Sequence, residues 1–70
     1  MKTGDQVEIG CDGRIVPGRV LMASPNGRSL ILTFETILDN HVAMMPVLQQ
    51  DDGGYVALVT GSPITLKAIP

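Results

Sequence analysis

The sequence predicts a mainly β protein, a small barrel or sandwich of five to six short antiparallel strands in a single domain, 1–70. Residues 29–35 alternate cleanly, with Leu30, Leu32 and Phe34 on one side, which is the period of a half-buried strand. Turn motifs containing Gly or Pro recur at roughly 8–12-residue spacing, as in small barrels and sandwiches. Seventy residues are enough for one domain only.

The first half of the chain contains three predicted strands, 5–10, 14–23 and 29–35. Cys11-Asp12-Gly13 is a turn between the first pair, because Gly supplies the positive φ of tight turns. The apolar alternation of 14–23 breaks at Pro17-Gly18, where we expect a bulge or an edge position. Ser24-Pro25-Asn26-Gly27 is the strongest turn signal and predicts a hairpin into 29–35.

The second half predicts strands at 41–49, 55–60 and 64–69, with hairpin chemistry at Asp51-Asp52-Gly53-Gly54. Residues 36–45 leave two alternatives open. One is a loop with a single short helical turn near 36–41, followed by the strand 41–49. The other is a helix with Thr36 as its N-cap that Pro46 would end. Segment 41–49 is apolar on both parities, so both of its faces must be covered. A second copy of the chain is one source of the second cover.

Composition narrows the ways in which so small a domain is stabilised. The chain has one Cys and one His, which excludes an internal disulfide and a zinc cage of the usual four ligands. Hydrophobic residues make up 44% and charged residues only 17% of the sequence. Small domains need a further source of stability beyond their core. By elimination we predict a homo-oligomer, with no metal and no cofactor.

Charge and hydropathy exclude several partners. The net charge is −2, and the five cationic residues are scattered, so we predict no binding to nucleic acid, which depends on Lys and Arg contacts to phosphate. No apolar run approaches the ~18 residues of a membrane helix, so we predict no membrane partner. One free Cys and the absence of a signal-like start predict a cytoplasmic protein.

Two resemblances concern the fold. The opening Gly4-Asp5-x-Val-x-Ile, the bent second strand and the tight hairpin at 24–27 resemble the general pattern of SH3-like barrels. The size and the same opening also resemble the plasmid-borne small-barrel dihydrofolate reductases. The Val-Gln-Ile-Tyr run that carries function in those enzymes has no match here, so the resemblance implies no activity.

The candidate binding residues are apolar. Adjacent Met44 and Met45 face opposite sides of a strand, so one can fill the core while the other meets a partner. Apolar residues at positions that look exposed would add to such a patch. The predicted interface residues are Ile15, Leu21, Ile31, Met44, Met45 and Val47.

Polar candidates are few. His41 has the only side chain that titrates near neutrality, and Asp39 shares its face on a strand. Tyr55 completes this candidate polar site. No Ser or Cys is placed beside His41 by sequence, so we predict no catalytic residue. Cys11 has Asp12 rather than a cation as its neighbour, which favours a half-buried apolar role over a reactive one.

These observations predict an interaction or self-assembly module of unknown function, with a possible further protein partner bound at a strand edge. The alternative is an oligomeric small-molecule binder or enzyme whose site forms between subunits. His41, Gln49, Gln50 and Tyr55 would supply its polar groups.

Overall fold

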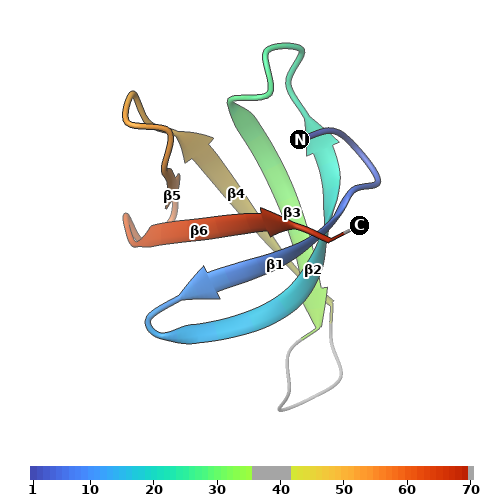
Figure 1. The fold of residues 1–70 in the computed structure, drawn as a ribbon, viewed down its shortest axis with the longest axis vertical. Coiled ribbons are helices and arrows are strands. Elements are labelled where there is room, and N and C mark those ends of the chain that lie inside the picture. Colours follow the sequence, from blue (N-terminus) through green and yellow to red (C-terminus); the bar gives the residue numbers. More distant parts are fainter. Residues whose placement is uncertain (36–41, 70) are drawn as a thin grey trace.

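The chain forms a closed antiparallel barrel of six strands (Figure 1) in a computed structural model that describes residues 1–35 and 42–69. Each strand pairs with the next along the chain, and the last pairs with the first. The predicted small β barrel is confirmed, and closure of the sheet rules out the sandwich. The strands are β1 (Gln6–Cys11), β2 (Arg14–Ala23), β3 (Ser29–Glu35), β4 (Val42–Gln49), β5 (Tyr55–Ala57) and β6 (Pro63–Ala68).

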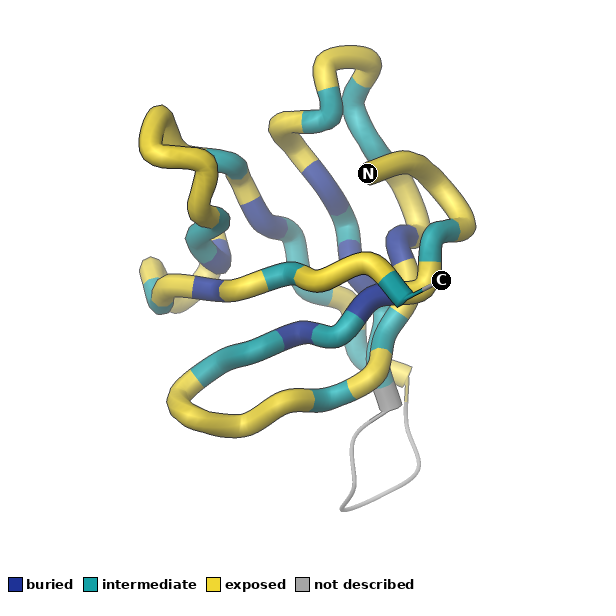
Figure 2. The backbone as a smooth tube through the Cα atoms, viewed as in Figure 1, coloured by how far each residue is buried: buried dark blue, intermediate teal, exposed yellow. Residues whose placement is uncertain are grey.

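Strand β3 is paired along both edges and has the predicted bounds. All of its residues pair with β4, from Ser29↔Leu48 to Glu35↔Val42, and most also pair with β2. Leu30 and Leu32 are buried as their alternation predicts. Buried positions recur along the strands, while the described loop residues 12–13, 25–26 and 51–54 are exposed (Figure 2). The core is entirely aliphatic and consists of Val7, Ile9, Val20, Leu30, Leu32, Val47, Ala57 and Ile64.

Turn chemistry sets the first hairpins. Asp12 and Gly13 have φ of 53° and 77°, the positive values of a type I′ turn, whose twist suits two antiparallel strands. In the β2–β3 hairpin, the Asn26 carboxamide oxygen lies 2.6 Å from the Ser24 hydroxyl and accepts a 3.0 Å bond from the Arg28 amide. Backbone conformation therefore sets the first turn, and side-chain hydrogen bonds fix the second.

The bulge in β2 lies later than predicted. The register with β3 runs regularly from Gly18 to Val20 and then shifts, so that Leu21 is the extra residue before Met22↔Ile31. A bulge reverses which face the following side chains occupy. Val20 is consequently buried, whereas Met22 is 59% exposed. Of the two alternatives expected at Pro17-Gly18, a bulge or an edge position, the edge is confirmed, since the pairing with β3 begins only at Gly18.

Gly18 is required by close packing inside the bent β2. A Cβ at this position would lie 2.5 Å from Ile9 Cδ1 and 2.6 Å from the Thr33 carbonyl oxygen. The neighbouring backbone cannot move away without disturbing the β2–β3 ladder. The sequence therefore bends β2 by omitting a side chain where two strands and the core converge.

Strand β5 is shorter than predicted. The chain leaves the ladder after Ala57, and residues 58–60 form a turn closed by the Gly61 amide donating to the Ala57 carbonyl at 2.7 Å. Gly61 has φ of 72°, which ends this turn and returns the chain to β6. The expected strand 55–60 was therefore wrong at its C-terminal end, because a glycine-terminated turn replaced the ladder.

Other boundaries differ from expectation by about one residue, the usual uncertainty of strand ends. β1 spans Gln6–Cys11 rather than 5–10, and β6 spans Pro63–Ala68 rather than 64–69. β4 begins at Val42 and pairs with β3 from there, so the helix alternative was wrong for 42–45. The predicted strand start at His41 and the helical-turn alternative for 36–41 lie outside the described residues.

Replacing Gly18 with Ala tests the packing argument. We expect a loss of about 1–3 kcal/mol of unfolding free energy, the usual cost of overpacking. Urea denaturation followed by circular dichroism, at one fixed protein concentration, measures it. The matched control is Gly54→Ala, where the nearest atom to a new Cβ is the carboxylate oxygen of exposed Asp52. An equal change in both variants would contradict the argument.

Candidate functional site

The outer side of β2, β3 and β4 carries a row of apolar side chains. Met22 pairs with Ile31 and Ile31 with Pro46, so these side chains lie side by side across the three strands. Leu58 lies next to this row, because its amide donates to the Pro46 carbonyl at 3.0 Å. We define the outer apolar face as Met22, Ile31, Val42, Met44, Pro46, Leu48 and Leu58.

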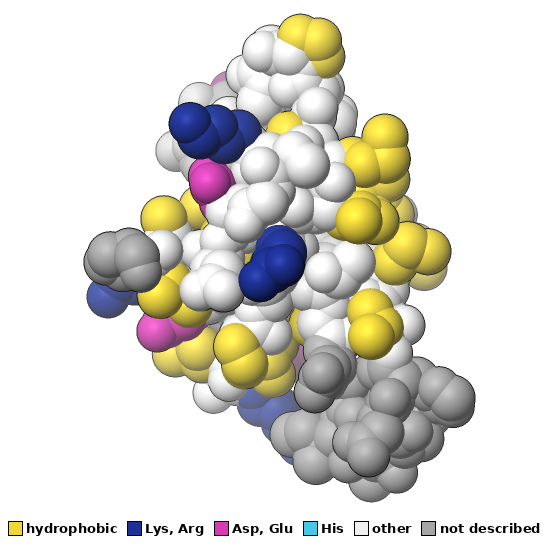
Figure 3. Space-filling view, turned by 90° about the vertical axis from the view of Figure 1, so that its right-hand side faces the viewer, with side chains coloured by type: hydrophobic (Ala, Val, Ile, Leu, Met, Phe, Trp, Pro, Cys, Tyr) yellow, Lys and Arg dark blue, Asp and Glu magenta, His cyan; other side chains and the backbone are white. Residues whose placement is uncertain are grey.

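The outer apolar face is strongly exposed. Met44 is 67% exposed, Val42 65% and Leu58 57%, whereas Ile31 and Pro46 at the centre of the face are half-buried. Hydrophobic side chains gather along the right-hand side of the view in Figure 3, with no charged side chain among them. Strand β4 therefore has one apolar side in the core and another in solvent, which a monomer leaves uncovered.

A hollow of about 260 Å³ lies within this face. Met22, Ile31, Pro46 and Leu58 form its apolar rim, and its floor includes the buried Leu30 and Val47. The hollow is apolar and shallow, so it suits an inserted side chain better than a polar small molecule.

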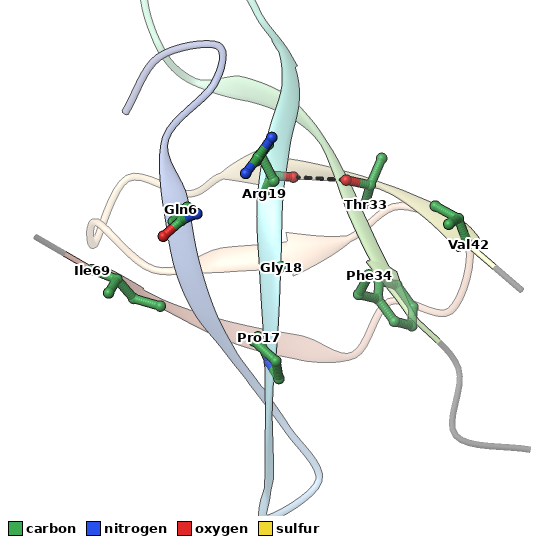
Figure 4. Close-up of a pocket in the computed structure, with 8 residues that line it drawn as sticks. All are labelled: Gln6, Pro17, Gly18, Arg19, Thr33, Phe34, Val42 and Ile69. Atoms are coloured by element: carbon green, nitrogen blue, oxygen red, sulfur yellow. Dashed lines mark hydrogen bonds between the residues drawn. The ribbon is translucent and has the colours of Figure 1, made fainter. Parts of the chain in front are cut away.

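A polar row borders the outer apolar face. Gln6, Arg19 and Thr33 follow one another across β1, β2 and β3 (Figure 4). On β4, Met44 lies opposite Thr33. The Thr33 hydroxyl donates to the Arg19 carbonyl at 3.4 Å. These side chains line an outer groove of about 450 Å³, with Gly18 and Phe34 among its other residues. An apolar centre with Arg at its rim is the usual anatomy of a protein interface.

A further pocket, of about 480 Å³, opens at one end of the barrel. Its walls are mainly apolar, and Arg14 and Asp12 stand at its mouth where the β1–β2 turn ends. Phe34 borders both this pocket and the outer groove. The apolar wall residues are Ile9, Cys11, Val16, Phe34 and Met45.

Cys11 lines the barrel-end pocket with a protonated thiol. Partial burial raises the pKa of this thiol, and the negative charge of Asp12 together with a hydrogen bond to its carboxylate raises the pKa further. Thiolate is the nucleophilic and metal-binding form of cysteine. At neutral pH Cys11 is therefore a small, weakly polar wall residue, as its sequence neighbours indicate.

Only some of the predicted interface residues lie at the outer apolar face. Ile31 and Met44 belong to the outer apolar face, and Leu21 is 43% exposed at the bulge beside it. Ile15 is 70% exposed, but it lies near the other end of β2, opposite Gly10.

Two predicted interface residues point inward instead. Val47 is fully buried in the core, and Met45 packs against that core. Adjacent strand residues face opposite sides, so Met44 takes the outer position and Met45 the inner one. Neither Met45 nor Val47 is available to a partner in this fold.

The predicted polar site is not assembled by the described residues. His41 and Asp39 lie outside them. Tyr55 is half-buried on β5, where it pairs with Gln49 and Ile64. The Gln49 side chain donates to the Gly53 carbonyl at 3.2 Å, so it closes its own hairpin, and Gln50 is exposed beside it.

Five residues of the outer apolar face were not among the predicted interface residues: Met22, Val42, Pro46, Leu48 and Leu58. Met22 reaches this face only because of the bulge at Leu21, which was not predicted. Leu58 was placed in a strand that ends before it. Val42, Pro46 and Leu48 were detectable, since they share strand parity with Met44.

The described part of the chain offers few ion pairs and few groups that could bind a metal. The one ion pair there joins Arg28 to Asp51 at 3.1 Å, and both side chains are exposed, so it contributes little. No three His, Cys, Asp or Glu residues among those described are grouped to hold a metal ion. Nor does the described chain contain a helix long and apolar enough to cross a membrane.

Comparisons with protein-family models, curated proteins and solved structures found no match to this chain.

The raised pKa of Cys11 predicts slow alkylation. Only thiolate reacts, so iodoacetamide should modify the wild type severalfold more slowly than Asp12→Asn at pH 8.5. Asn tolerates the positive φ of position 12, so the turn is kept. Mass spectrometry of timed samples across pH 7–10 measures the rates. The midpoint of the rate profile should lie at higher pH in the wild type, and coincident profiles would refute the role of Asp12.

Proposed function

We propose that this protein is a self-assembly module whose outer apolar face binds the same face of a second copy. The observation that carries the proposal is the uninterrupted row Met22–Ile31–Pro46 on the solvent side of a sheet. Closed oligomers of identical chains are most often two-fold dimers that pair one patch with itself.

The size of the patch supports an interface. From the exposed fractions of its members, the outer apolar face presents on the order of 600 Å², the upper end of the largest patch on a typical monomer. A standard interface covers about 800 Å² on each partner. The polar row of Gln6, Arg19 and Thr33 extends the patch toward that area.

The shape of the outer apolar face supports a second copy of the chain as its binding partner. Met44 protrudes, while Met22, Ile31, Pro46 and Leu58 surround a hollow one row away. A two-fold axis between Met44 and the hollow would seat Met44 of each copy in the hollow of the other. Unbranched Met side chains adapt to such pockets.

Three features support the narrower proposal of an SH3-like barrel in the cytoplasm. The strongly bent β2 and the tight β2–β3 hairpin favour an SH3-like barrel, and the single Cys favours a reducing cytoplasm. A catalytic role between subunits has less support, because Gln49 is engaged in its own hairpin.

A charged substitution in the centre of the face tests the proposal. We expect Met22→Glu to weaken self-association by at least about 30-fold, the equivalent of the 2 kcal/mol of an interface hot spot. Met44→Glu should act in the same direction. Both positions are exposed, so the barrel should fold normally. Light scattering coupled to size exclusion, over a range of protein concentrations, measures the association.

Ile15→Glu is the matched control. It introduces the same charge on an equally exposed apolar residue of β2, outside the outer apolar face. It should leave the solution mass unchanged. A wild type that stays monomeric at every concentration, or a control as disruptive as Met22→Glu, would overturn the proposal.

A further inference from the structure

At one end of the barrel, segments of two strands lack a pairing partner on one side in the part of the chain that the structure describes. The pairing of β2 with β3 begins at Gly18, so residues 14–17 pair with β1 alone. β4 pairs with β5 only over residues 47–49, which leaves 42–45 without a partner on that side among the described residues. The barrel-end pocket lies between these half-paired segments.

The pocket has the size and lining of a small-molecule site. Its volume of about 480 Å³ falls within the usual range of ligand pockets, and barrel mouths are a common place for them. Ile9 supplies a core side chain to its wall, while Val16, Phe34 and Met45 are half-buried around it. A ligand here would replace water against apolar side chains and gain hydrophobic stabilisation.

The charges at the mouth favour an anionic head group. Arg14 pairs directly with Cys11, so both side chains lie on the pocket side of the hairpin, whereas Asp12 belongs to the turn beyond them. Arg14 is exposed and forms no ion pair with any described residue. Its guanidinium presents a planar set of donors that matches a carboxylate.

We propose that the barrel-end pocket binds a small amphipathic carboxylate, with its hydrocarbon part against Ile9, Val16 and Met45 and its carboxylate on Arg14. This site lies inside one copy of the chain and is formed independently of the outer apolar face. Its charged lining residues are Asp12 and Arg14, both at the β1–β2 turn, and the rest of its wall is apolar apart from the Cys11 thiol.

Methyl-detected NMR with octanoate as the probe tests the site. Saturable shifts are expected at the methyl groups of Ile9, Val16 and Met45, and none at Met22 or Met44. 1-Octanol and octylamine, which share the chain length, should bind at least tenfold more weakly. Arg14→Gln should lower the affinity for octanoate about tenfold and leave the affinity for 1-octanol unchanged.

Arg19→Gln is the matched control, since it removes an exposed Arg from the outer groove instead. It should leave octanoate binding unchanged. The titration is repeated on Met22→Glu, so loss of self-association and loss of the pocket are separable. Shifts confined to Met22 and Met44, equal affinity for octylamine, or no effect of Arg14→Gln would each overturn the proposal.

Discussion

The double hydrogen-bonded pairing of β3 is the constraint on which the structure depends. Because both edges of this strand are held by ladders, its alternation is imposed on β2 and β4 as well. Leu30 and Leu32 are thereby directed into the core, and Ile31 into the centre of the outer apolar face. One strand register thus decides both what stabilises the barrel and what it offers to a partner.

Much of this architecture could be predicted from local chemistry. The Asp-Gly and Pro-Asn-Gly turns locate the first hairpins, and the alternation of 29–35 locates the central strand. The end of β5 could not be predicted, because Leu58, Val59 and Thr60 are good strand residues in isolation. The turn forms there because Gly61 adopts a left-handed conformation and its amide closes the turn on the Ala57 carbonyl. Local strand propensity does not report this outcome.

The candidate surface was only partly predictable for a related reason. The sequence shows that β4 is apolar on both parities, but not which parity faces the core. Pairing with β3 settles this, since Val47 lies opposite Leu30 while Pro46 lies opposite Ile31. The outward orientation of Met22 depends on the bulge at Leu21, and no Gly, Pro or other turn residue marks the position of that bulge in the sequence. The barrel-end pocket arises from unequal strand lengths, which a sequence pattern does not report.

The pairing of β1 with β6 has a consequence for how the barrel is assembled. Every other ladder joins neighbouring strands, so each hairpin can form with a short loop to close. The β1–β6 seam alone joins distant parts of the chain and carries most of the entropic cost of closure. Until it forms, β1 and β6 each present an unpaired edge. During synthesis, aggregation of the nascent chain would therefore be governed by the delay before β6 emerges.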